Sequence, residues 1–166
     1  MESHSNGIKL SNRPSFNITK ILVTIDGSDI ALRAAMTAIQ LAEKYGAELV
    51  ILYVIDSKIR YETVGDDAFP RYLGSLKQVV DVAIEKGQKL VDEVKQKVSD
   101  NKTTVRTEVL LGVSSVVKEI VEYAEKHKID LIVVGTRGIT GIKKVLLGST
   151  ASGVVTYSQC PVMVIK

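Results

Sequence analysis

The sequence predicts an α/β fold, with a single doubly wound five-stranded parallel sheet and helices on both faces. The first observation is a set of short, nearly continuous apolar runs, rich in β-branched residues, that alternate with segments of helical period. Because the runs lack in-and-out alternation, they are typical of parallel strands covered on both faces. The expected strands are Ile21–Ile25, Leu49–Ile55, Val105–Leu111, Leu131–Val134 and Val162–Ile165, of which Val105–Leu111 alternates most and suits an edge.

The second observation is the recurrence of apolar residues at helical spacing between these runs. The first helical stripe extends from Ala31 to Ala42, and Gly46 follows as a C-terminal stop. The others extend from Leu76 to Val98, from Val116 to Ala124 with Ser114 or Ser115 as cap, and from Ser149 to about Tyr157, before Pro161.

The order of strands and helices also predicts where a ligand binds. Right-handed crossovers bring the carboxyl ends of all strands to one edge of the sheet, and ligands bind there, at the switch point of strand order. We expect the segment Asp56–Gly74 to be a long, irregular, mobile loop near the same rim.

Length, charge and cysteine content limit the classes to which this protein can belong. The chain has 166 residues, which suits one domain. Its net charge of +3, from 22 Lys and Arg against 19 Asp and Glu, is too small to predict nucleic acid or a membrane as partner. No apolar run reaches the roughly 18 residues that a membrane span needs. Cys160 is the sole cysteine, so no intramolecular disulfide can form, and this favours the cytoplasm.

The first residues differ from the rest. Residues 1–18 are rich in Ser, Asn, Gly and Pro and contain no apolar core of a secretion signal. We expect them to be a mobile N-terminal tail, and residues 19–166 to form the domain.

A glycine-rich stretch directly follows the strand Leu131–Val134. Gly135 and Gly138 would let backbone amides approach a ligand without obstruction by a Cβ atom. Arg137, between them, adds a guanidinium that could reach phosphate oxygens.

The same stretch ends at the start of the last predicted helix. Gly148, Ser149 and Thr150 offer amides and hydroxyls at a helix N-terminus, where the dipole favours an anion. Together the two clusters predict a phosphate cradle, although the alternative is that the glycines merely turn the chain. The pattern is neither a Walker A loop nor a dinucleotide-binding fingerprint.

A second polar cluster, Asp26-Gly27-Ser28, follows the first strand. Asp26 is placed to accept hydrogen bonds from a ribose or to sit near a metal, whereas the alternative is that Asp26 or Ser28 caps the next helix. Backbone groups near Val54 could pair with the edge of a base, and Asp56 is expected to cap a turn. Lys143 and Lys144 are expected to be solvated loop charges, with the steering of a triphosphate as the alternative. Asp66 and Asp67 are expected to be solvated loop charges rather than metal ligands.

These motifs resemble those of the universal stress proteins of the ATP-binding type. The signature of that family is Gly, two residues, Gly, nine residues, and Gly followed by Ser or Thr. Gly135, Gly138 and Gly148-Ser149 fit it without insertion. Three other segments look like the family's as well, so the similarity covers about residues 19–166: Ile21–Ser28, Leu52–Asp56 and Cys160–Ile165.

The resemblance implies a Rossmann-like fold of the adenine nucleotide alpha hydrolase-like type, ATP with Mg²⁺ or Mn²⁺, and a homodimer paired through Val162–Ile165. In the family, the residue at the Asp26 position holds the ribose and the one at the Val54 position contacts adenine through its backbone. The residues expected at the nucleotide are Thr24, Ile25, Asp26, Val54, Val134, Gly135, Arg137, Gly138, Gly148, Ser149 and Thr150. The metal ligands stay unassigned.

Three functions remain in competition. The favoured one is a stress-response module whose ATP occupancy is read by an unidentified protein partner. The second is an enzyme, such as a slow ATPase, but no constellation suited to orienting water and handling its proton is evident. The third is a stress protein that acts by protein contacts alone, which the intact glycine signature opposes.

Overall fold

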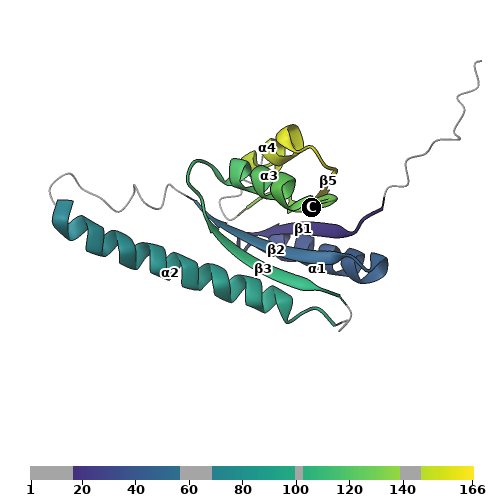
Figure 1. Cartoon of the computed structure of the whole chain (residues 1–166), viewed down its shortest axis with the longest axis horizontal. Helices are drawn as coiled ribbons and strands as arrows, with labels where there is room; N and C mark the ends of the chain where they lie inside the picture. Colours follow the sequence, from purple (N-terminus) through teal and green to yellow (C-terminus); the bar gives the residue numbers. More distant parts are fainter. Residues whose placement is uncertain (1–16, 57–68, 100–102, 139–146) are drawn as a thin grey trace, which may run out of the picture.

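The computed structural model describes residues 17–56, 69–99, 103–138 and 147–166 (Figure 1). Strands and helices alternate along the whole of this chain. In order, the elements are β1 (Lys20–Ile25), α1 (Asp29–Tyr45), β2 (Glu48–Ile55), α2 (Phe69–Lys95), β3 (Val105–Leu111), α3 (Val116–His127), β4 (Leu131–Gly135), α4 (Ser149–Tyr157) and β5 (Val162–Ile165). Within the described ranges, no helix is long and apolar enough to cross a membrane.

All strands pair in parallel, in the order β3-β2-β1-β4-β5. In the register, Ile21 of β1 lies beside Leu49 of β2 on one side and Leu131 of β4 on the other. The chain fills the sheet from β1 outwards to β3, and then reverses to place β4 and β5 on the other side of β1. The switch point therefore lies between β1 and β4, and β3 is an edge strand as its alternating sequence predicted.

Two helical layers bury the two faces of the sheet (Figure 1). Ile21 and Val23 of β1 point into a core with α1 and α2, whereas Leu22 between them points into a core with α3 and α4. Successive side chains of β1 thus enter opposite apolar cores, and this is the physical reason for its unbroken apolar sequence. The doubly wound α/β fold expected from the sequence is confirmed.

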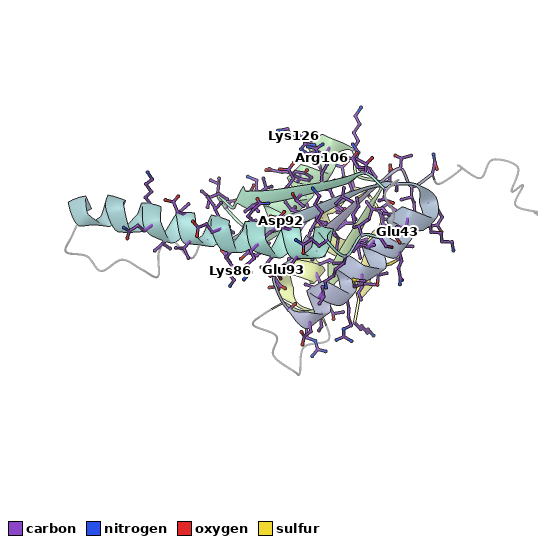
Figure 2. All side chains as sticks on the ribbon, turned by 90° about the horizontal axis from the view of Figure 1, so that it is seen from below. Glu43, Lys86, Asp92, Glu93, Arg106 and Lys126 are labelled. Carbon is purple, nitrogen blue, oxygen red and sulfur yellow. The ribbon has the colours of Figure 1, made fainter. Side chains whose placement is uncertain are left out.

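The helix ends follow local capping chemistry. The Ser28 hydroxyl accepts a hydrogen bond from the Ala31 amide at the start of α1, and Gly46 ends that helix in a left-handed conformation with φ of 64°. Ser115, rather than Ser114, caps α3 by accepting from the Lys118 amide. After α2, the Ser99 amide and hydroxyl both donate to Glu43 of α1, which Figure 2 shows beside the end of α2.

The helix α2 departs from the sequence prediction. It begins at Phe69 and ends at Lys95, so residues 69–74, expected in an irregular loop, are helical. Pro70 is compatible with this start because the first turn of a helix needs no amide hydrogen bonds. Residues 57–68 of the expected loop, and the expected tail apart from its last two residues, lie outside the described residues.

Candidate functional site

Two loops leave the sheet side by side at the switch point between β1 and β4. After Ile25, the last residue of β1, the chain passes through Asp26-Gly27-Ser28 into α1. After Gly135, the last residue of β4, it continues through Thr136-Arg137-Gly138. Topology alone thus places the two polar clusters of the sequence at one crevice.

The Asp26 carboxylate brings these two loops into contact. Its Oδ1 accepts a hydrogen bond from the Ser28 amide at 2.9 Å. Its Oδ2 lies so close to Gly138 that a Cβ atom on residue 138 would collide with it. Because Ser28 caps α1, Asp26 is not the helix cap, and its carboxylate lies at the rim between the loops.

Tyr53 lies behind Asp26 in the adjacent strand β2. It pairs with Ile25 in the sheet register, and its ring is buried. Burial, and then the negative charge of Asp26, raise the pKa of the Tyr53 hydroxyl above its usual value. Sequence reasoning missed Tyr53 because an aromatic residue in an apolar run is typical of a core, and nothing in the run marks the electrostatic influence of Asp26 on its hydroxyl.

The glycine-rich loop is closed at its base by a backbone hydrogen bond. The Gly148 amide donates to the Thr136 carbonyl at 2.7 Å, and the Thr136 amide donates to the Ile165 carbonyl at 2.7 Å. A Cβ atom on residue 148 would lie 3.0 Å from the Thr136 carbonyl oxygen. Gly148 therefore allows a close approach of backbone to backbone, and its amide is already engaged within the protein.

The N-terminus of α4 carries backbone amides that make no helical hydrogen bond. Gly148 is the N-cap of this helix and provides no side-chain hydrogen bond to it. The first helical hydrogen bond runs from the Ser152 amide to the Gly148 carbonyl at 2.9 Å, so the amides of residues 149–151 precede the helical ladder. Ser149 is exposed and Thr150 half-buried at this end. The arrangement favours an anion at the start of α4.

A buried hydroxyl lies next to this loop closure. Thr136 is 3% exposed, and its Oγ1 has no hydrogen-bond partner among the described residues. The other such atom there is the Tyr123 hydroxyl on α3, but burial and the neighbouring Glu108 carboxylate raise the pKa of Tyr123 to about 12. Tyr123 belongs to α3, whereas Thr136 directly follows β4, so the Thr136 hydroxyl is the buried group at the switch point without a partner among the described residues. It lies inside the glycine signature, but no sequence pattern distinguishes it from the other residues of that stretch.

Gly135 has a packing role that the sequence did not reveal. A Cβ atom on this residue would lie 2.9 Å from Cγ2 of Ile30 and 3.3 Å from the Ala31 amide nitrogen. The glycine therefore lets the first turn of α1 lie directly against the end of β4.

The remaining expected residues occupy the ends of the strands. Ile25 and Val134 are 7% and 4% exposed, so any contact with a ligand would be made by their backbone. Thr24 is half-buried. Val54 follows Tyr53, the last residue of β2 that pairs with β1, so its backbone lies beyond the end of that ladder. Arg137, half-buried, lies between Thr136 and Gly138.

Other charged candidates are not placed at the site. Lys143, Lys144, Asp66 and Asp67 lie outside the described residues. In the described ranges, no group of three or more His, Cys, Asp or Glu side chains is arranged to hold a metal ion.

Comparison with known proteins gives a consistent result. A sequence model of the universal stress protein family matches residues 17–166. The chain is 41% identical over 147 residues to the universal stress protein MJ0531 of Methanocaldococcus jannaschii, covering 89% of this chain and 81% of the relative. The solved structure of MJ0577, from the same organism, superposes with a TM-score of 0.77 at 25% identity, covering 90% and 96% of the two chains. A universal stress protein solved in complex with cAMP is 26% identical, with a TM-score of 0.55 over 89% and 96%.

The fold and the crevice define a doubly wound α/β protein whose polar site lies at the switch point of a parallel sheet. The match over residues 17–166 then makes the assignment specific: the chain belongs to the universal stress protein family.

Proposed function

We propose that this protein binds ATP, with Mg²⁺ or Mn²⁺, in the crevice between β1 and β4, and acts as a nucleotide-dependent stress-response module. The observation that carries the proposal is the uncapped N-terminus of α4, held beside the end of β4 by the bond from Gly148 to Thr136. The similar protein solved with cAMP supports an adenine nucleotide as the ligand class.

The phosphates are assigned to the start of α4. The amides of Ser149 and Thr150 point out of the helix end, where the dipole adds a favourable potential for negative charge. The Thr136 hydroxyl is a buried group without a partner among the described residues, and a nearby anion would give it an acceptor. Arg137 and Gly138 complete the cradle from the β4 side, the first with a charge and the second with an accessible backbone.

The ribose and the base are assigned to the ends of β1 and β2. A carboxylate offers about four acceptor positions, so the Asp26 side chain can bond the Ser28 amide and still accept from ribose hydroxyls. Val54 lies beyond the pairing of β2 with β1 while it pairs with Leu110 of β3 on its other side, and its backbone is assigned to the edge of adenine. Ile25 and Val134 close the crevice floor with buried side chains.

The phosphates of the nucleotide, rather than a cluster of protein side chains, are assigned as the main ligands of the metal ion. Mg²⁺ usually keeps several waters and binds phosphates together with one or two protein oxygens. The described residues offer no cluster of three acidic or imidazole ligands. The cation would therefore arrive with the phosphates.

A binding module is favoured over an enzyme. Hydrolysis needs an oriented water and a group to take its proton. In the described part of the crevice, the Asp26 carboxylate accepts from the Ser28 amide and is assigned to the ribose, and His127 lies on α3, stacked on Tyr123 with ring centroids 4.1 Å apart. We propose slow turnover at most, in the cytoplasm, with a protein partner reading the bound state.

We also propose a homodimer formed by antiparallel pairing of β5. Val162–Ile165 is an edge strand, so one side of its backbone lacks a neighbouring strand within the described chain. Its residues are half-buried or exposed, and Met163 is 36% exposed.

The test is a calorimetric titration of protein emptied of nucleotide with ATP and Mg²⁺, alongside GTP and cAMP. We expect saturable binding of ATP with one site per chain, and weaker binding for Arg137→Gln than for the control Arg33→Gln, which changes an exposed arginine on α1. Absence of binding by folded protein would contradict the proposal, and the glycines would then only shape the chain.

A further inference from the structure

A groove lies between α3 and α4, the two helices that cover one face of the sheet. It has a volume of about 540 Å³ and is lined by side chains of both helices. The helices approach closely at one point, because a Cβ atom on Gly153 of α4 would lie 2.7 Å from Cγ2 of Val117 on α3. Ser115 and Ser149, at the starts of the two helices, lie at one end. The groove runs along α3 and α4 and shares only Ser149, at the start of α4, with the crevice between β1 and β4.

The lining of the groove is largely apolar. Val117 and Val121 of α3 are half-buried, and Gly153 of α4 packs directly against Val117. Tyr157, at the end of α4, is 68% exposed although it lines the groove. An apolar hollow bordered by an exposed aromatic residue is typical of an interaction site rather than of an ordinary solvated surface.

The rim of the groove carries net negative charge. Lys118 and Glu122 form an ion pair at 3.6 Å, so their charges offset each other. Glu125, one turn further along α3, is exposed and makes no ion pair with any described residue. Glu125 is therefore the uncompensated charge among the groove's lining residues.

We propose that this groove binds an amphipathic helix of a partner protein, with an apolar face and flanking basic residues. A helix is favoured over an extended peptide because the groove presents side chains of two helices, whereas an extended segment would need the open backbone of a sheet edge. The nine-residue helix α4, which borders the groove, is about 13 Å long at about 1.5 Å per residue, and this length matches two to three turns of a docked helix. Basic residues of the partner would meet Glu125.

The experiment uses the full-length protein without added nucleotide and a labelled synthetic probe. The probe is a 15-residue peptide with Leu at positions i, i+3, i+4 and i+7 and Lys elsewhere on its flanks, compared with a scrambled peptide of the same composition. Binding is measured by fluorescence anisotropy. We expect saturable binding of the amphipathic peptide, and at least tenfold weaker binding of the scrambled one.

Matched variants locate the binding surface. Val121→Asn removes an apolar contact within the groove, whereas Val82→Asn makes the same change at a 64%-exposed position on α2. We expect Val121→Asn to weaken peptide binding at least tenfold and Val82→Asn to leave it unchanged. Glu125→Gln should weaken binding two- to threefold and reduce its salt dependence.

Three outcomes would overturn the proposal: no binding of the peptide by folded protein, equal binding of the scrambled peptide, or equal losses in Val121→Asn and Val82→Asn. A fourth such outcome would come from the oligomeric state of the same variants, measured by sedimentation. If Val121→Asn alone changes the oligomeric state, the groove is occupied by a second copy of this chain and not by a partner helix.

Discussion

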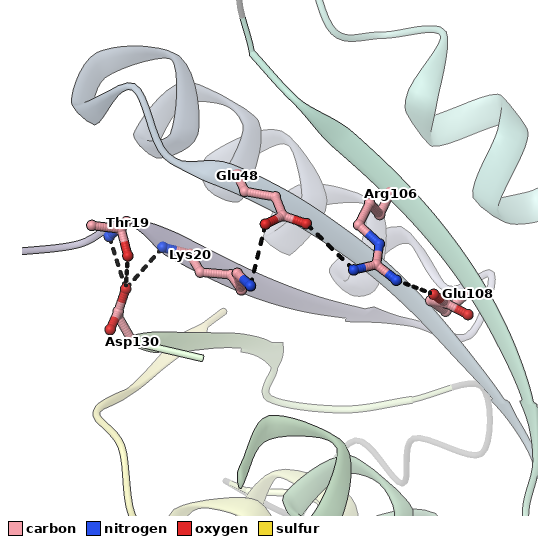
Figure 3. A network of polar contacts seen from close by, with 6 residues as sticks. All are labelled: Thr19, Lys20, Glu48, Arg106, Glu108 and Asp130. Carbon is pink, nitrogen blue, oxygen red and sulfur yellow. Dashed lines mark hydrogen bonds and ion pairs between the residues drawn. The ribbon is translucent and has the colours of Figure 1, made fainter. Parts of the chain in front are cut away.

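The amino ends of the parallel strands form one edge of the sheet and their carboxyl ends form the opposite edge. These two edges differ in how their polar groups are satisfied. At the amino edge, Asp130 Oδ2 accepts three hydrogen bonds, from the Thr19 amide at 2.8 Å, the Thr19 hydroxyl at 2.7 Å and the Lys20 amide at 2.9 Å (Figure 3). Next to it, Glu48 bridges Lys20 at 3.3 Å and Arg106 at 3.8 Å. These groups find their partners within the chain.

The carboxyl edge leaves some of its polar groups without such partners. There, α4 begins without a side-chain cap, and the buried Thr136 hydroxyl has no partner among the described residues. A Cβ atom on residue 138 would collide with the Asp26 carboxylate, so only glycine fits at this position. We infer that the amino edge serves stability, and we propose that the carboxyl edge keeps hydrogen-bonding capacity for a ligand.

The largest expected effect is on the carboxyl edge. Gly138→Val should weaken ATP binding at least 100-fold, about 2.7 kcal/mol, because its Cβ would displace the Asp26 carboxylate from the rim. Calorimetry measures the affinity, and circular dichroism checks the fold. Gly46→Asn serves as control, since Asn tolerates the left-handed conformation of that remote helix end. A folded Gly138→Val protein with wild-type affinity would remove residue 138 from the site.

At the amino edge the expected effect is on stability. Asp130→Ala should lower the free energy of unfolding by about 2 kcal/mol, because it removes the acceptor of three hydrogen bonds. Urea unfolding measures this loss, with Asp81→Ala on the exposed face of α2 as control. ATP affinity should stay the same. A change in affinity without a change in stability would reverse the roles of the two edges.

A smaller effect concerns the ribose. Asp26→Ala should weaken ATP about tenfold but leave free triphosphate nearly unaffected, because Asp26 is assigned to hydroxyls and not to phosphates. Competition titrations with both ligands measure the two losses, and Asp29→Ala tests an acidic neighbour in the first turn of α1. Equal weakening of both ligands would move Asp26 away from the ribose.

Thr136→Val should act in opposite directions on stability and on binding. Replacing a buried hydroxyl that lacks a partner by a methyl group should stabilise the ligand-free protein by about 0.5–1 kcal/mol. The same change should weaken ATP if the hydroxyl meets a phosphate. Thermal unfolding with and without ATP separates the effects, and Thr37→Val, at an exposed hydroxyl bonded to the Arg33 carbonyl, is the control. Destabilisation of the ligand-free protein would mean that the hydroxyl is satisfied.

The smallest effect is a dependence of stability on pH. Burial alone would raise the pKa of Asp130, but the hydrogen bonds from Thr19 and Lys20 outweigh it and lower that pKa. The stabilisation is therefore present above the pKa of about 3.9 of an unfolded Asp and is lost as pH falls through the folded value. Urea unfolding between pH 3 and 6 should show a shallower decline for Asp130→Ala than for wild type. Identical slopes would contradict the assignment.

Most of the fold follows from periodicity and capping. The strand Val105–Leu111 and the helix Ser149–Tyr157 begin and end where the sequence predicted, because apolar period, Gly and Pro act locally. The start of α2 at Phe69 could not be predicted, since Pro70 and Gly74 are typical of loops. The first turn of a helix tolerates Pro, and periodicity does not mark where a solvated helix begins.

The candidate site was predictable in part. The loops after β1 and β4 could be placed together from topology, and so Asp26 and Gly138 could be assigned to one crevice. The contact of Gly135 with Ile30, the engagement of the Gly148 amide and the burial of Thr136 could not be predicted. They depend on how α1 and α4 pack against β4, which is tertiary geometry that no local pattern encodes.

The most direct test of the difference between the two edges is a two-dimensional amide NMR titration of the nucleotide-free protein with ATP and Mg²⁺. We predict that the largest shifts fall on the amides of Gly138, Ser149 and Thr150, with further shifts near Asp26 and Val54. The amides of Thr19 and Lys20, which donate to Asp130 at the amino edge, should stay in place. Shifts centred on the amino edge or between α3 and α4, with residues 138 and 149–150 unchanged, would contradict the assignment of the nucleotide to the carboxyl edge.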